Sequence, residues 1–178
     1  QLGKVLDELD RQGLTDSTAI VFTTDHGYHL GEHGFWKKGN LHEEVTRVPL
    51  MIRAPGVKPG RTDSLAELVD FYPTCTDLLG LPAPKKIVGN SLVPILQNPE
   101  NKVRKTALSL HNEKHIKNKG YAIRSNSWTY MNYGDQGEIL YDMVKDPEQY
   151  TNLIDNPDYL ETVRKARKRL RLRLQQVQ

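Results

Sequence analysis

The sequence predicts the end of an α/β domain followed by a small α+β subdomain with an antiparallel sheet. In the first 105 residues, short apolar runs alternate with helical patterns, which is typical of a sheet covered by helices on both faces. From residue 106 onward, three β-prone runs are separated by turn residues, and a basic amphipathic stretch closes the chain. We therefore expect two parts, residues 1–105 and residues 106–178.

The overall composition is that of a globular protein. The 178 residues are 37% hydrophobic and 26% charged, with no low-complexity bias and no internal repeat. No apolar run reaches the ~18–20 residues that a membrane-spanning helix needs, so we expect no membrane span. The single cysteine, Cys75, excludes an internal disulfide framework. It lies in an apolar helical pattern, and we expect a small buried core residue rather than a catalytic thiol.

One helix and two strands are predicted in the first part of the chain. Apolar residues recur at helical spacing up to Gly13, but no N-cap or first-turn signal precedes them. We therefore expect this helix to begin upstream, and the chain to be a fragment of a longer protein. Residues 19–23 and 48–52 form short, continuous apolar strands, which are typical of a parallel sheet.

The remaining elements have clear boundary signals. A helix is predicted with Asp70 as its N-cap, Pro73 in its first turn and Gly80 as its stop. The antiparallel sheet is predicted from the runs 106–112, 120–134 and 137–143. The final helix has an apolar stripe of Leu160, Val163, Leu170, Leu174 and Val177.

Charge is unevenly placed along the chain. The net charge is +3, but residues 161–178 contain seven Arg or Lys and one Glu, which leaves the rest of the chain negative. This basic stretch could bind a polyanion such as a sulfated glycan or nucleic acid. The simpler interpretation is an amphipathic helix with a solvated basic face, so the stretch does not decide the function.

The segment TTDHGYHLGEHGFWKKGN, residues 23–40, gathers most of the chemically active side chains. Asp25 and His26 follow directly after an apolar strand, and ligands bind at the carboxyl ends of strands in open α/β sheets. Both side chains could face one metal ion. The dipeptide alone equally allows a turn-forming aspartate and a histidine satisfied by polar neighbours.

Other residues of this segment are also candidates. A lysine such as Lys37 or Lys38 supplies a point positive charge suited to a tetrahedral oxyanion, although paired lysines are commonly solvated. His29, Glu32 and His33 could be ligands, substrate contacts or general acids. The sequence GEHG lacks the two histidines four residues apart that define HExxH, so a zincin-type site is not expected.

Two further histidines, His111 and His115, lie at the start of the predicted antiparallel sheet. Their spacing of four residues would suit a metal pair on a helix, but the surrounding pattern is strand and loop. We expect surface or substrate-contact roles for them and no metal.

The combination of motifs resembles the sulfatase family. In that family a strand ends in S/T-D-H/N-G and is followed by G-E-H/R-G, an aromatic-x-K element and R/H-V-P-L-x-x-x-x-P-G. Here the corresponding residues are TTDHGYHLGEHGFWKKGNLHEEVTRVPLMIRAPG, and EILYDMVKDPEQYTNL is similar to the closing D-P-x-E-x-x-N-L turn. The resemblance covers nearly the whole chain and implies an alkaline-phosphatase-like α/β sandwich. Within the family, the segment is most similar to iduronate-2-sulfatase-like glycan sulfatases.

The resemblance implies roles for matched positions. Asp25 and His26 would be two ligands of a divalent cation, usually Ca²⁺, and Lys38 would contact the sulfate, with Lys37 one residue away. Hard Ca²⁺ prefers oxygen ligands, which suits Asp25, whereas imidazole suits transition metals better. The identity of the metal therefore stays open. His33, Trp36 and His111 are candidate sugar contacts.

The resemblance also implies parts that this sequence does not contain. Sulfatases use a formylglycine made from Cys or Ser in a C/S-x-P-x-R motif, and Cys75 lacks the following Pro and Arg. We therefore expect the nucleophile in an N-terminal part of the same enzyme, and no turnover by this fragment alone. A sulfated small molecule or glycan is the expected substrate, without nucleic acid, in a periplasmic, secreted or lysosomal location.

Two alternatives remain open. A phosphoesterase or phosphonate hydrolase of the alkaline phosphatase superfamily also uses Asp-His at strand ends. A non-catalytic module could instead bind acidic glycans through the basic stretch and the small sheet.

Overall fold

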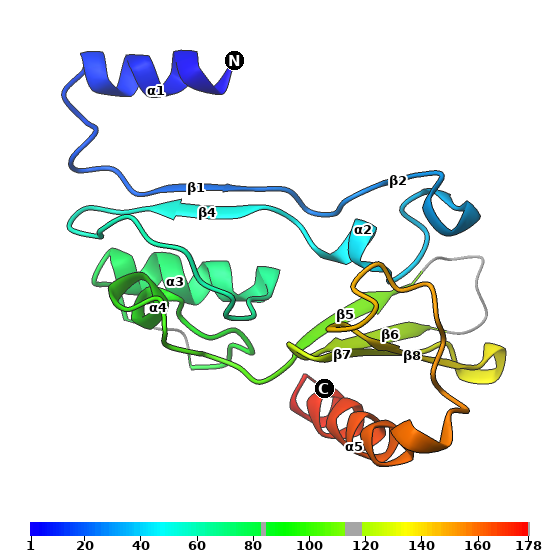
Figure 1. The fold of residues 1–178 in the computed structure, drawn as a ribbon. Helices are drawn as coiled ribbons and strands as arrows, with labels where there is room; N and C mark the ends of the chain where they lie inside the picture. The colour runs from blue at the N-terminus through cyan, green and yellow to red at the C-terminus, as the bar shows by residue number, and fades with distance from the viewer. Residues whose placement is uncertain (83–84, 113–118, 178) are drawn as a thin grey trace.

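The computed structural model describes residues 1–82, 85–112 and 119–177. Strand β1 (Ile20–Thr23) pairs with β4 (Leu50–Arg53) in an antiparallel ribbon, with Ile20 opposite Arg53 (Figure 1). The parallel arrangement expected for these strands is therefore wrong for this pair. Parallel neighbours need a crossover of a dozen or more residues, usually a helix. The connection here, residues 24–49, is long enough but contains only two short strands, the 3-10 turn η1 (Glu32–Gly34) and the four-residue α2 (Glu43–Thr46), with no crossover helix. It returns the chain in the opposite direction.

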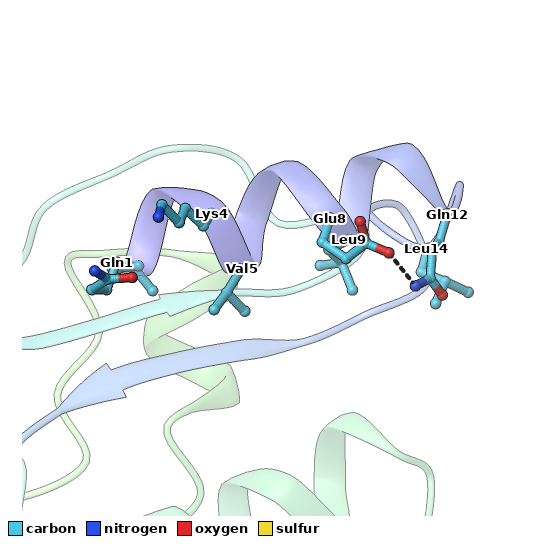
Figure 2. Close-up of a pocket in the computed structure, with 8 residues that line it drawn as sticks. Gln1, Lys4, Val5, Glu8, Leu9, Gln12 and Leu14 are labelled. Atoms are coloured by element: carbon cyan, nitrogen blue, oxygen red, sulfur yellow. Dashed lines mark hydrogen bonds between the residues drawn. The ribbon is translucent and has the colours of Figure 1, made fainter.

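Helix α1 (Leu2–Arg11) forms where the apolar spacing predicts it, but it stands apart from the rest of the fold (Figure 1). None of its residues is buried, and Val5 is 65% exposed. Figure 2 shows Val5 and Leu9 on the side of α1 that faces the following chain, with Leu14 just beyond the end of the helix, around a shallow hollow of about 550 Å³. Its apolar stripe thus has little to pack against within the described part of the chain.

Helix α3 (Phe71–Leu78) confirms the boundary signals of the sequence. Asp70 occupies its N-cap position, although its carboxylate accepts hydrogen bonds from the Glu67 and Asn90 amides and makes none to α3. Gly80 has φ of 65°, a conformation that glycine adopts without steric cost. The expected burial of Cys75 is wrong, because the thiol lies on the exposed side of α3. The buried side consists of Pro73, Thr74 and Thr76. Thr74 is among the most buried residues, and its hydroxyl donates a hydrogen bond to the Asp70 carbonyl at 2.6 Å.

The predicted antiparallel sheet is present. Its strands are adjacent in chain order: β5 (Ala107–His111), β6 (Gly120–Arg124), β7 (Trp128–Asn132) and β8 (Glu138–Asp142). Helix α5 (Leu160–Gln176) covers one face, as Figure 1 shows, and the shorter α4 (Val93–Gln97) lies beside α3.

The two faces of this sheet pack against different parts of the chain, because side chains alternate along each strand. Ile123, Tyr130 and Leu140 form one cluster with α5, through its residues Val163, Ala166 and Leu170. The opposite face carries Ala122, Met131 and Tyr141, which pack against Leu41 from the segment that follows the GEHG loop. The sheet therefore separates α5 from the loop that carries the candidate site.

A buried ionic network links the two parts of the chain. The Arg104 guanidinium lies 2.9 Å from a Glu67 carboxylate oxygen and also pairs with Asp70, which is fully buried. Arg173 of α5 reaches the same Glu67 oxygen at 2.8 Å. Paired and hydrogen-bonded charges of this kind tolerate burial that a single charge would not. The boundary expected at residue 105 adjoins this network, and the division into two parts remains a prediction.

No helix in the part of the chain that the structure describes is long and apolar enough to cross a membrane.

Candidate active site

Asp25 and His26 lie where β1 runs out into a loop that presses closely on α2. The Gly27 amide donates a hydrogen bond to the Val45 carbonyl at 2.8 Å. A Cβ atom on Gly27 would lie 1.9 Å from the Glu44 carbonyl oxygen, so only glycine fits here. This close approach fixes the backbone that carries the Asp-His pair.

The hydrogen bonds of His26 leave one ring nitrogen available as an acceptor. His26 Nδ1 lies 2.8 Å from the Gly27 carbonyl oxygen, which can only accept, so Nδ1 carries the proton. In the neutral ring Nε2 then has a lone pair that can accept a hydrogen bond or bind a metal ion. The Lys38 ammonium lies 2.8 Å from this Nε2 atom. Asp25 Oδ2 lies 3.6 Å from the same nitrogen.

Three residues predicted from the sequence thus converge on one point: Asp25, His26 and Lys38. The Asp25 side chain is 81% exposed and that of His26 is 31% exposed. Burial raises the pKa of Asp25, but the hydrogen bonds from its own backbone amide, the Thr24 hydroxyl and the His26 backbone amide outweigh it. The pKa of Asp25 therefore lies below its ordinary value, and the carboxylate is charged at neutral pH.

The GEHG loop is closed by a short hairpin of β2 (His29–Leu30) and β3 (Trp36–Lys37). His29 is fully buried, and its Nε2 atom donates a hydrogen bond to Asn40 Oδ1 at 2.9 Å. Glu32 accepts a hydrogen bond from the Leu30 amide at 2.6 Å. These contacts give His29 and Glu32 a role in holding the loop together.

His33 has an unusual backbone and an enclosed ring. Its φ is 55°, in the left-handed region that few non-glycine residues adopt. The side chain is only 8% exposed, and Nε2 lies 3.2 Å from Glu44 Oε1. The ring stacks on His42 at 4.5 Å between centroids and lies 4.7 Å from the Tyr150 ring. In this structure the polar edge of His33 is thus engaged by Glu44, while its role as a sugar contact stays a prediction.

The remaining candidates lie apart from the Asp-His-Lys group. Trp36 is 68% exposed on β3, and Lys37, with φ of 73°, follows it on the surface. His111 ends β5, where its Nε2 atom is buried and lacks a hydrogen-bond partner among the described residues. Within the described chain, neither Trp36 nor His111 hydrogen-bonds to Asp25, His26 or Lys38. His115 lies outside the described residues.

Several residues that support the site were given no role by the sequence, although they lie in the stretches that resemble the sulfatase family. His42 Nε2 lies 3.2 Å from the Tyr141 hydroxyl, 99 residues away along the chain. Burial lowers the pKa of His42 to about 4, with a further contribution from His33. Gln149 is 1% exposed and its side-chain oxygen accepts a hydrogen bond from the Glu43 amide at 2.8 Å. Only the folded chain brings these segments together.

The donor set fits part of a metal site. A carboxylate and a neutral imidazole are both metal ligands, and the two side chains lie side by side at the end of β1. No group of three or more His, Cys, Asp or Glu side chains is arranged to hold a metal ion within the described ranges. A complete coordination shell would need further donors besides Asp25 and His26.

The fold is shared with solved sulfatases and related hydrolases. One solved structure, of a protein in complex with its substrate D-glucosamine-2-N,6-O-disulfate, superposes with a TM-score of 0.91 and 32% identity, over 98% of this chain and 37% of that one. The phosphonate monoester hydrolase of Agrobacterium radiobacter superposes with a TM-score of 0.86 and 30% identity, over 98% of this chain and 38% of the other. These neighbours confirm the predicted fold class.

Sequence comparison then identifies the family. The family described as N-sulphoglucosamine sulphohydrolase, C-terminal, matches residues 31–176. N-acetylglucosamine-6-O-sulfatase of Bacteroides thetaiotaomicron is 38% identical over 169 residues, which cover 89% of this chain and 30% of that protein. Arylsulfatase K of Homo sapiens is 32% identical over 163 residues, covering 85% and 30% of the two chains. The chain belongs to the sulfatase family, and it spans about 30% of the length of these curated relatives.

Proposed function

We propose that this chain is the C-terminal part of a sulfatase that hydrolyses sulfate esters on a sulfated sugar or glycosaminoglycan. The observation that carries the proposal is the convergence of Asp25, His26 and Lys38 at the end of β1 in a member of the sulfatase family. The share of the relatives' length that the chain spans supports its being one part of a longer enzyme.

Each of the three side chains has a distinct task in the proposed reaction. Asp25 and His26 would hold a divalent cation, most simply Ca²⁺, which neutralises charge on the bound sulfate. The hydrogen bond from His26 Nδ1 to the Gly27 carbonyl keeps Nε2 turned toward that position. The Lys38 ammonium adds a second positive charge, and it stabilises charge that develops on the sulfate oxygens as the ester bond breaks. The nucleophile, a formylglycine, is expected in the N-terminal part of the enzyme.

The proposed substrate class follows from the relatives. One is an N-acetylglucosamine-6-O-sulfatase, and a solved neighbour binds D-glucosamine-2-N,6-O-disulfate. We therefore propose a sulfated glucosamine unit as the first substrate to test. Exposed Trp36 and Lys37, on the rim of the GEHG loop, are the proposed sugar contacts, together with His33 and His111. The finer similarity to iduronate-2-sulfatase, and a periplasmic, secreted or lysosomal location, stay predictions.

The direct test is release of inorganic sulfate from glucosamine 6-sulfate and glucosamine N-sulfate by the full-length protein. The proposal expects release that is lost on substitution of Lys38, and no release by residues 1–178 alone. The coding sequence upstream of Gln1 provides a second test, since it should contain a C/S-x-P-x-R motif. Absence of sulfate release from any aryl or sugar sulfate would overturn the proposal.

A second candidate function is phosphonate or phosphate ester hydrolysis. It is favoured by the structural match to the phosphonate monoester hydrolase, which is nearly as close as that to the sugar-bound structure. Comparing kcat/KM for an aryl sulfate with that for an aryl phosphonate decides between them. A preference for the phosphonate would move the assignment to this second class.

A further inference from the structure

The exposed side of α5 is a strongly basic surface. Its buried side consists of Val163, Ala166 and Leu170, which pack on the sheet. The exposed basic residues are Arg164, Lys165, Arg167, Lys168, Arg169 and Arg171. Arg164, Lys168 and Arg171 recur at helical spacing on one side of α5, over about 10 Å of helix axis.

Most of these charges are not neutralised by the protein. Lys165 lies 3.4 Å from Glu161, and Arg167 pairs with Glu138 of β8. Arg164, Lys168, Arg169 and Arg171 form no ion pair with any carboxylate in the described chain. Four guanidinium or ammonium groups are therefore available to an external anion. A guanidinium can bind two oxygens of one sulfate or phosphate at once, which favours arginine at such surfaces.

A hollow of about 410 Å³ adjoins this basic surface, between α5 and the sheet. Leu170 and Leu174 contribute apolar surface to it. Its polar lining includes Arg171 and Gln175, which offer a guanidinium and an amide group. The Asn132 amide also lines the hollow but is already hydrogen-bonded to Glu138, Tyr130 and the Gly134 amide. The Arg167 guanidinium lowers the pKa of Glu138, the acid in this lining, so the carboxylate is ionised and already paired. The hollow can thus accept hydroxyl groups and sulfates without an unpaired acid opposing them.

The basic surface is separate from the candidate active site. Strand residues Ile123 and Tyr130 point toward α5, whereas their neighbours Ala122 and Met131 point toward the segment after the GEHG loop. A ligand on α5 would therefore not reach Lys38 directly. It would instead hold another part of the same large molecule.

We propose that α5 and the adjoining hollow form a second binding surface for an anionic polysaccharide, most simply a sulfated glycan chain. The choice of a glycan rests in part on the proposed function, in which a sulfated sugar is the substrate. It is also supported locally, because α5 itself carries no aromatic side chain between residues 164 and 176 on which a nucleic-acid base could stack. Of the two tyrosines that line the hollow, Tyr130 is 1% exposed and Tyr121 packs against the cluster between the sheet and α5. The hollow, with the Gln175 amide and the Arg171 guanidinium, suits sugar hydroxyls and sulfates.

The test removes three charges from the basic stripe of the full-length protein. The variant R164Q/K168Q/R171Q is compared with K58Q/R61Q/K102Q, which removes three charges from exposed loops. Binding of a fluorescent heparin oligosaccharide is measured by polarisation between 50 and 200 mM NaCl. We expect the α5 variant to bind at least about tenfold more weakly at 50 mM NaCl, with a slope of log K against log [salt] smaller by about two to three. The loop variant should remain within about twofold of wild type.

Turnover separates this proposal from the proposed function. If the α5 variant loses heparin binding but releases sulfate from a monosaccharide at the wild-type rate, both proposals stand. If neither the wild-type protein nor the two variants release sulfate, but heparin binding depends on α5, the binding surface stands and the sulfatase function fails. Equal weakening in both variants, or none in the α5 variant, overturns the binding surface. Tighter binding of a DNA duplex than of heparin, lost in the same variant, overturns the choice of a glycan.

Discussion

The side-chain oxygen of Gln149 accepts a hydrogen bond from the backbone amide of Glu43, 106 residues earlier in the chain. Glu43 begins α2, and the carbonyl of Glu44, its next residue, is the atom against which Gly27 packs. Tyr150, beside Gln149, lies against the His33 ring. The turn after β8 therefore supports the GEHG loop and the Asp-His segment from the C-terminal part of the chain.

Replacing Gln149 should destabilise the fold. Its φ is 63°, so alanine would keep the strained backbone and also leave the Glu43 amide without its acceptor. We expect Gln149→Ala to lower the free energy of unfolding by about 2 kcal/mol, measured by urea denaturation. Gln149→Gly also loses the hydrogen bond but relieves the backbone strain. If that strain contributes, the glycine variant should lower the free energy of unfolding by less than the alanine variant. A change below about 0.5 kcal/mol for the alanine variant would show that this contact does not hold the turn.

Substitutions of Lys38 and of Lys37 should have different effects on the kinetics of the full-length enzyme. Lys38 lies beside His26, whereas Lys37 lies on β3. We expect Lys38→Ala to lower kcat about 10²–10³-fold, because a positive charge is lost where the sulfate gains negative charge. Lys37→Gln should change KM more than kcat if it contacts the sugar. The measurement is steady-state sulfate release, with Lys58→Gln as an exposed control. The opposite ranking would mean that Lys37 is the sulfate-contacting residue.

Removing the proposed metal should affect the protein even without substrate. We expect Asp25→Asn and His26→Ala to weaken Ca²⁺ binding by at least about tenfold, since each removes one of the proposed ligands. Added Ca²⁺ should raise the Tm of the wild-type full-length protein and should raise that of either variant less. Calorimetric titration of chelator-treated protein measures the affinity directly. Unchanged affinity in both variants would remove Asp25 and His26 from the coordination shell.

His42 should make stability depend on pH. Its pKa is about 4 in the folded protein and returns to about 6.5 on unfolding. Below pH 6.5 the unfolded chain therefore binds a proton that the folded chain does not, so stability is lost as the pH falls from about 6.5 to about 4. The loss attributable to His42 should reach about 2 kcal/mol at pH 5. His42→Gln should show a correspondingly smaller difference in free energy of unfolding between pH 7 and pH 5. Parallel pH profiles for the two proteins would contradict the assignment.

Local patterns predicted those features that depend on local physics. The end of α3 at Gly80 follows from the conformational freedom of glycine, and the antiparallel sheet follows from β-prone runs with turns between them. The grouping of Asp25, His26 and Lys38 followed from their position after an apolar strand and from the family resemblance. Their exact contacts required the fold.

The errors and omissions have a common physical origin. The direction in which β1 pairs with β4 depends on the connection between them, and an apolar run looks the same in either direction. The helical pattern around Cys75 did not reveal which side of α3 meets the core, and that side proved to be the threonine side. The contact between Gln149 and Glu43 joins distant segments through one side chain and one backbone amide, and a hydrophobic pattern along the sequence does not predict such a contact.

The sheet of β5–β8 packs against α5 on one face and against the segment after the GEHG loop on the other. Along β7, Tyr130 supports α5 and Met131 supports the segment after the GEHG loop. Inserting one residue within β7 would move every following side chain of the strand to the opposite face, so α5 and the segment after the GEHG loop would both lose packing contacts. An insertion in the turn at residues 133–137 would leave the alternation intact. Length variation among relatives of this chain should therefore collect in that turn and spare the strand.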